Sequence, residues 1–281
     1  MPRPALVRRH RRRQPNGDIH ASWSPTVGRC AAGMLGVLVA ESWPIGSTPA
    51  PGGRAPIAAA MVDLARSLTR ATTPDRLGES ADRHHRVAGP AWLLPLALVP
   101  GPSTGLAPDI AELVARGHVP TDEVDACVAY VNLAAHIVAH QPVRAAIADV
   151  TDLSVPAEQP LETGCHATDG LTLGGWALTQ PASFAELLGK LTATSSPPVA
   201  AAAAGLVGLR DNLDAIPATW YRQLDLSDTC LALAPTLQQT PGPQPAPTAP
   251  AEPRQPDMPT QHAPTSSNAS GPDEPNSGGA R

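Results

Sequence analysis

The chain has 281 residues and a formal net charge of −5, a length that suits one large domain or two small ones. Hydrophobic residues make up 42% of it but aromatic residues only 3%, so Ala, Leu and Val must form most of the core, which favours packed helices over a β-sandwich. The body of the chain has no basic face, which argues against nucleic acid as a partner.

The N-terminal segment, residues 1–26, is basic, polar and without periodicity, and we expect it to be a disordered tail. An apolar run follows at 31–40, but 17 intervening residues that include Asn, Gly, Asp and Pro argue against a signal peptide. The run is also too short to cross a membrane as a helix, so we expect no membrane partner. The four widely spaced cysteines fit reduced thiols, and together these features predict a cytoplasmic protein.

Two helices are predicted in the middle of the body. The first has Asp109 as its N-cap, buries Ile110, Leu113 and Val114 on one face, and ends at Gly117. The second has Thr121 as its N-cap, acidic residues in its first turn, and ends before Pro142. Its apolar positions recur at steps of three and four residues: Val124, Cys127, Val128, Val131, Ala135 and Val138.

Two further helices carry clear start signals. Ser183 and Glu186 have the spacing of a capping box, and Pro198 lies where the first turn of an alanine-rich helix tolerates proline. No convincing alternating strand is present. We therefore predict an all-α domain of about eight to twelve helices over residues 27–238. Residues 239–281 are rich in Pro, Ser and Thr, and we expect a second disordered tail there.

Short motifs in the second half of the chain occur in a recognisable order. They are Trp176-Ala177-Leu178, the segment Ser183-Phe184-Ala185-Glu186, and Leu213-Asp214-Ala215-Ile216-Pro217 leading to Trp220. In this order they resemble the C-terminal part of the ADP-ribosylglycohydrolase family. Earlier segments resemble the family's opening helix, its Ala-Pro-Leu segment and its middle helix, in the family's order: 32–43, 92–99 and 124–140.

The resemblance implies an all-α orthogonal helical bundle and hydrolysis of the bond that links ADP-ribose to a protein side chain. It also implies two Mg²⁺ or Mn²⁺ ions, held by aspartates of a Thr-Asp-Asp-Thr segment and of a Gly-Gly-Asp-Thr-Asp-Thr loop. Such hard ions need several carboxylate oxygens. Here the aspartate positions fall on residues without a carboxylate: Pro56, Ile57, Ser195 and Pro197. We therefore expect a degenerate member without a metal cofactor, binding Mg²⁺ or Mn²⁺ only if residual family chemistry survives.

Three functional hypotheses follow from this pattern. The first is a pseudoenzyme that binds ADP-ribose, an ADP-ribosylated protein or another protein partner, with Thr194, Ser195 and Ser196 as ligand-binding candidates. The second is a hydrolase with substitute ligands, which requires carboxylates from elsewhere to converge on one cleft; the candidates are Glu41, Asp63 and Asp169. The third is a non-catalytic helical scaffold, which a cleft plugged by proline and isoleucine side chains would favour.

Other reactive side chains are better explained by structure. His136 and His140 have the spacing of a two-histidine zinc face, but no third ligand is evident, and both lie near a helix C-terminus, which suits a cation. Cys165 and His166 are adjacent in sequence, an arrangement that rarely forms a catalytic dyad. The pair His84-His85 lies in a charged stretch expected to be an exposed loop. Four tryptophans are predicted packing anchors: Trp43, Trp92, Trp176 and Trp220.

Overall fold

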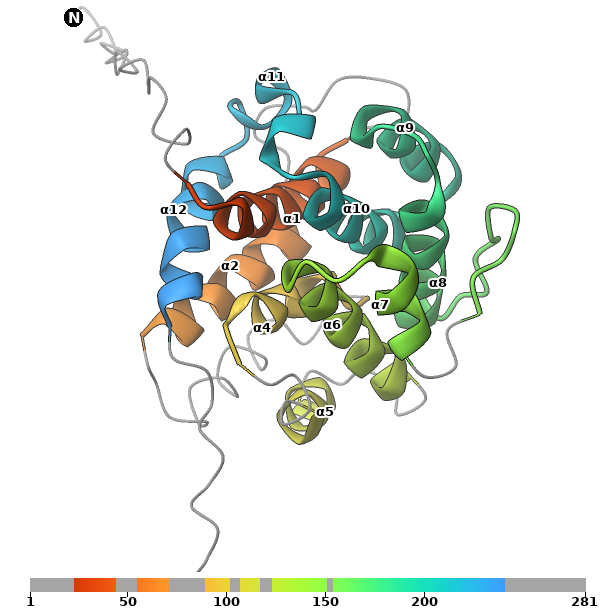
Figure 1. The fold of residues 1–281 in the computed structure, drawn as a ribbon, viewed down its shortest axis with the longest axis horizontal. Coiled ribbons are helices and arrows are strands. Elements are labelled where there is room, and N and C mark those ends of the chain that lie inside the picture. The colour runs from red at the N-terminus through yellow and green to blue at the C-terminus, as the bar shows by residue number, and fades with distance from the viewer. Residues whose placement is uncertain are drawn as a thin grey trace, which may run out of the picture. The chain divides into compact units, whose positions relative to one another are not determined.

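The computed structural model describes residues 23–43, 55–70, 89–101, 107–116, 123–150 and 154–240, and these residues form helices and no strand (Figure 1). The all-α prediction is confirmed. The described helices belong to one unit, Met1–Gln244, and the second unit, Pro245–Arg281, lies outside the described residues. In chain order the elements are α1 (Pro25–Glu41), α2 (Pro56–Thr69), η2 (Ala91–Leu93), α4 (Leu94–Leu98), α5 (Ala107–Arg116), α6 (Val124–Val138), α7 (Val143–Asp149), α8 (His166–Thr179), α9 (Phe184–Thr194), α10 (Pro197–Asp211), η5 (Leu213–Ala215), α11 (Ala218–Tyr221) and α12 (Ser227–Gln239).

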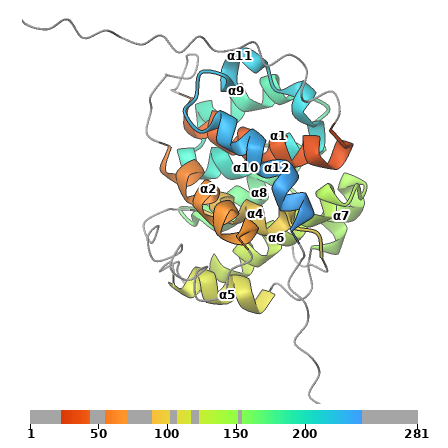
Figure 2. The ribbon, with the colours of Figure 1, turned by 90° about the vertical axis from the view of Figure 1, so that its left-hand side faces the viewer.

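Helices α1 and α10 lie side by side and antiparallel, and most of the other helices pack around this pair (Figures 1 and 2). Glycines allow the close approach. A Cβ built at Gly36 of α1 would lie 3.0 Å from the carbonyl carbon of Ala204, and one built at Gly208 of α10 would lie 2.8 Å from that of Ala32. The antiparallel pairing places the C-terminal end of α1 beside the N-terminal end of α10.

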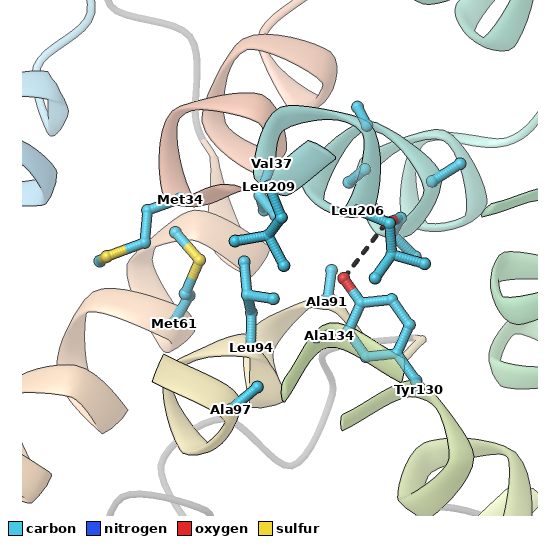
Figure 3. Packing of buried hydrophobic residues seen from close by; sticks show 14 of the residues in the cluster. Met34, Val37, Met61, Ala91, Leu94, Ala97, Tyr130, Ala134, Leu206 and Leu209 are labelled. Atoms are coloured by element: carbon cyan, nitrogen blue, oxygen red, sulfur yellow. Dashed lines mark hydrogen bonds between the residues drawn. The ribbon is translucent and has the colours of Figure 1, made fainter. Parts of the chain in front are cut away.

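The core between these helices consists of small and aliphatic side chains, as the composition predicts (Figure 3). Leu209 of α10 faces Leu94, Leu206 lies near Tyr130, and Met34 of α1 lies near Met61 of α2. The buried hydroxyl of Tyr130 donates to the carbonyl of Ala202 at 3.2 Å, which satisfies the one polar atom on that side chain. Complete burial raises the pKa of Tyr130, so the phenol stays neutral.

The predicted start signals of α9 and α10 are confirmed. Ser183 accepts from the backbone N–H of Glu186, whose carboxylate accepts from Ser183 N at 2.9 Å, a complete capping box. Pro197 and Pro198 occupy the first two positions of α10, where a missing N–H is tolerated.

The predicted bounds of α5 and α6 need correction. Helix α5 begins at Ala107, so Asp109 lies inside its first turn and is not the N-cap, although Ile110, Leu113 and Val114 are buried as predicted. Helix α6 begins at Val124, and Thr121 and Gly117 lie outside the described residues.

The end and the buried face of α6 also differ from the prediction. The helix ends at Val138, four residues before the predicted stop at Pro142, because His140 takes a left-handed conformation with φ of 63°. Of the predicted positions, Cys127, Val131 and Val138 are buried, while Val124, Val128 and Ala135 are only half-buried. The reason is that the face of α6 toward α10 is centred on Tyr130.

Candidate functional site

The N-terminal ends of α8 and α10 meet at one place, against the turn Gly89–Pro90. Gly89 has φ of 76°, and a Cβ built there would lie 3.4 Å from Pro198 Cβ and 3.7 Å from His166 Cβ. One turn further into α8, a Cβ at Gly170 would lie 2.8 Å from that of Ala202 in α10. The two helices therefore begin side by side and run in the same direction. Since helix N-termini carry partial positive charge, this end of the bundle favours negatively charged groups.

The N-terminal end of α2 is joined to this region by Glu41, the last residue of α1. The Glu41 carboxylate accepts from Ile57 N at 2.7 Å and from Ala58 N at 2.8 Å. Burial raises the pKa of Glu41 more than these two backbone N–H groups lower it. Ala55, the N-cap residue, makes no side-chain cap, so Glu41 takes that role from another helix. Glu41 is thus a tertiary cap of α2.

The Asp169 carboxylate also accepts several hydrogen bonds, from the turn that precedes α8. Its buried carboxylate accepts from Thr163 N at 2.9 and 3.0 Å, from Thr163 Oγ1 at 2.8 Å and from Gly164 N at 3.0 Å. Gly164 has φ of 96°, a conformation that glycine adopts freely. Asp169 therefore fixes the turn that leads into α8.

Two further glutamates, which the sequence did not single out for this purpose, cap the other helices. The buried Glu123 accepts from Ala167 N in the first turn of α8 at 2.8 Å, and Glu162 accepts from Ser196 N, directly before α10. Neither contact has a local sequence signal, because the partners are 44 and 34 residues away along the chain.

The three candidate catalytic carboxylates do not converge. Asp63 lies about two turns beyond Ile57 in α2 and pairs with Arg66 at 3.5 Å, away from Glu41. Within the described ranges, no group of three His, Cys, Asp or Glu side chains could hold a metal ion. Near the positions that the resemblance assigns to the metal ligands, Glu41 and Glu162 already accept from backbone N–H groups. The residues at those positions are Ser195, which offers a hydroxyl, and Pro56, Ile57 and Pro197, whose side chains offer no ligand atom. This donor set does not fit Mg²⁺ or Mn²⁺.

Three buried polar atoms have no hydrogen-bond partner in the described part of the chain. They are Trp92 Nε1, His166 Nδ1 and Ser196 Oγ. His166 begins α8, Ser196 precedes α10, and Trp92 lies in η2, three residues after the Gly89 that contacts both helix ends. Buried polar atoms are nearly always hydrogen-bonded, so these three are candidates for contacting a ligand.

A hollow of about 250 Å³ lies beside the same helix ends. Its walls come from segment 154–163, from α8 and from the α9–α10 junction, and they are mainly apolar. Ser195, a predicted ligand-binding residue, lines it, whereas Thr194 does not: its hydroxyl donates to Lys190 O at 2.9 Å and accepts from Gln159. No cationic side chain is among the described residues that line the hollow.

The remaining candidates take structural positions. His140 Nε2 lies 3.0 Å from Thr26 Oγ1, and no described group joins it and His136 in a metal-binding set. Trp43 and Trp220 pack edge to face with ring centroids 4.6 Å apart. His84 and His85 lie outside the described residues, as do most of both predicted tails.

The described cysteines are free thiols, and three of them are buried: Cys30, Cys127 and Cys230. Burial raises the pKa of each of these thiols to about 12. Cys165 is half-buried and precedes α8.

Comparison with known proteins connects this architecture to the resemblance seen in the sequence. No protein-family model matches the chain, and no curated protein matches it significantly. A solved structure of an ADP-ribosylglycohydrolase-related protein complex superimposes with a TM-score of 0.62 at 20% identity, covering 77% of this chain and 99% of that one. The chain has an ADP-ribosylglycohydrolase-like fold. At this identity the likeness establishes the fold and not the activity. No described helix is long and apolar enough to cross a membrane.

Proposed function

We propose that this ADP-ribosylglycohydrolase-like protein binds ADP-ribosyl groups without hydrolysing them. The observation that supports the proposal is the use of the carboxylates around the helix ends. Glu41, Glu162 and Asp169 each accept hydrogen bonds from backbone N–H groups and so stabilise helix starts and turns. Carboxylates engaged in this way are poorly placed to bridge divalent ions.

The loss of ligands bears directly on the family reaction. The two ions that the family uses would hold ribose hydroxyls and activate water, and a serine hydroxyl is a poor substitute for a carboxylate, while proline and isoleucine offer no donor. We therefore propose no metal-dependent step for this chain. Its own residues would bind and orient the ligand, and the bond to ADP-ribose would stay intact.

The helix ends keep features suited to an anionic, hydroxyl-rich ligand. Their partial positive charge favours a diphosphate. His166 Nδ1 can accept or donate according to its tautomer, Trp92 Nε1 donates, and Ser196 Oγ does either, which together suit phosphate oxygens and ribose hydroxyls. The apolar hollow beside them, which has no described cation, suits an uncharged part of the ligand better than a phosphate.

The two alternatives receive less support. A cleft plugged by Pro56, Ile57, Pro197 and Pro198 would favour a scaffold. Ile57 is buried, but Pro56 and Pro197 are exposed and Pro198 is half-buried, so the prolines do not fill one. An active hydrolase would need substitute ligands to converge, and Glu41, Asp63 and Asp169 are held in separate contacts. A protein that binds an ADP-ribosylated partner remains part of the proposal, since the modified side chain carries the same group.

Two measurements on the full-length protein test the proposal. Incubation with an ADP-ribosylated protein and Mg²⁺ should release no ADP-ribose above a blank, and Mg²⁺-dependent release would refute the claim of lost catalysis. In binding assays with ADP-ribose, Ser196→Ala and His166→Ala should each weaken affinity. Thr236→Ala is the matched control, because this exposed hydroxyl lies on α12 and bonds only to Ala232 O. Equal affinities for all four proteins would place the ligand elsewhere.

A further inference from the structure

Segment 154–163, here named the strap, lies between α7 and α8 and ends at the turn that Asp169 holds. We infer that Glu162 is a latch: its carboxylate holds the strap against the start of α10 and occupies Ser196 N, a donor that an anionic ligand group at this helix end would use. This inference rests on the proposed function for the identity of the ligand, but the latch itself is a property of the fold.

The strap is fastened by two sets of contacts. In the first, Thr163 and the next residue, Gly164, donate to the buried Asp169 carboxylate, which fixes the C-terminal end of the strap. In the second, Gln159 Nε2 donates to Thr194 Oγ1, and Glu162 accepts from Ser196 N. The second set of contacts is exposed to solvent, so it is the set that can open.

The start of α10 offers few backbone N–H donors, and Glu162 occupies one of them. Proline has no backbone N–H, and Pro197 and Pro198 fill the first two positions of the helix. Ser196 N is therefore the only backbone donor at positions 196–198, and Glu162 occupies it; the next backbone N–H along the helix is that of Val199. A phosphate that takes Ser196 N must displace the carboxylate, because both need the same N–H group.

Opening the strap next to Glu162 exposes little additional surface of Leu161, whereas Val155, further along the strap, packs against the core. Leu161, next to the latch, is already 90% exposed, although it borders the hollow under the strap. The neighbouring Ser196 Oγ, which has no partner among the described residues, would gain an acceptor when a phosphate replaced the carboxylate. The strap thus covers the hollow and competes with the ligand through one residue.

The test compares Glu162→Ala with Glu158→Ala in the full-length protein, since both remove one exposed carboxylate from the same strap. ADP-ribose affinity is measured with chelator present, and hydrogen exchange is measured over residues 154–163. Glu162→Ala should tighten binding roughly five-fold, the change that corresponds to a typical N-cap contact, and should speed exchange of the strap. Glu162→Gln keeps an acceptor, so its affinity for ADP-ribose and its rate of strap exchange should lie between those of Glu162→Ala and of the unmodified protein.

The outcomes separate the latch from the proposed function. Equal gains in affinity for Glu158→Ala and Glu162→Ala would mean general charge repulsion and would overturn the latch. Unchanged exchange and affinity in Glu162→Ala would also overturn it. If no protein binds ADP-ribose but only Glu162→Ala speeds exchange of the strap, the latch stands and the proposed function fails.

Discussion

The same substitution should have opposite effects at two glycines, because only one of them lies in the contact between α1 and α10. A Cβ added at Gly208 would lie 2.8 Å from the carbonyl carbon of Ala32 and 3.2 Å from Gly33 N, against the 3.4 Å at which ordinary contact begins. The colliding atoms belong to backbone, so no side-chain rotation relieves them and the helices must move apart. Gly189, on an exposed face of α9, has nothing within 4 Å of such a Cβ.

These distances set the expected magnitudes. Overpacking against backbone at Gly208 should destabilise the folded state by about 3 kcal/mol, the upper end of the usual range. The higher helix propensity of alanine should stabilise it by about 1 kcal/mol. Gly208→Ala should therefore lower the free energy of unfolding by about 2 kcal/mol, while Gly189→Ala should raise it by up to about 1 kcal/mol. Urea unfolding measures both, and melting temperatures should move by roughly 2–4 °C per kcal/mol. A Gly208→Ala protein at least as stable as the unmodified chain would refute the close-packing argument.

Three further predictions concern stability and reactivity. Arg210 donates to four carbonyls at the end of α8 and in the turn after it. Arg210→Ala should therefore lower the free energy of unfolding in urea by about 3 kcal/mol, whereas Arg144→Ala, at an exposed position, should change it by less than about 0.5 kcal/mol. Equal effects of the two substitutions would contradict the role of these hydrogen bonds. An alkylating reagent counted by mass spectrometry should modify Cys165 first in the folded protein, because burial protects the other three thiols; early modification of any of those would contradict the burial. Burial raises the pKa of Glu41 above its ordinary value of 4.5, so the folded state binds the proton more tightly than the unfolded chain does. The contribution of Glu41 to the free energy of unfolding therefore falls as the pH rises from 4.5 through the raised pKa. The stability difference between the unmodified chain and Glu41→Ala should shrink over the same pH range in urea titrations, and growth of the difference would contradict the sign.

The sequence predicted the helical architecture where the signals are local. The capping box of Ser183 and Glu186 and the prolines at the start of α10 involve residues three or fewer positions apart, and both were found. Asp109 was misplaced as a cap because α5 begins two residues earlier, a shift that cap preference alone does not determine. The face of α6 was only partly predicted, since Tyr130 sets it by packing against α10.

The site was less predictable for a physical reason. A lone carboxylate such as Glu41 gives no sign in sequence that it will cap a helix that begins 15 residues later. Glu123 and Glu162 were not singled out as site residues, because their partners are distant along the chain. That Pro56, Ile57, Ser195 and Pro197 carry no carboxylate is visible in the sequence. The structure adds that the nearby carboxylates stabilise helix starts.

The most direct test of the central proposal is calorimetric titration of ADP-ribose into the full-length protein, once with Mg²⁺ and once with chelator. Our account predicts binding of equal affinity in both buffers, because the protein's own donors at the starts of α8 and α10 hold the ligand. Binding that requires Mg²⁺ would contradict the account and point to a working metal site. Absence of binding in both buffers would contradict it as well and leave only the fold in common with ADP-ribosylglycohydrolases.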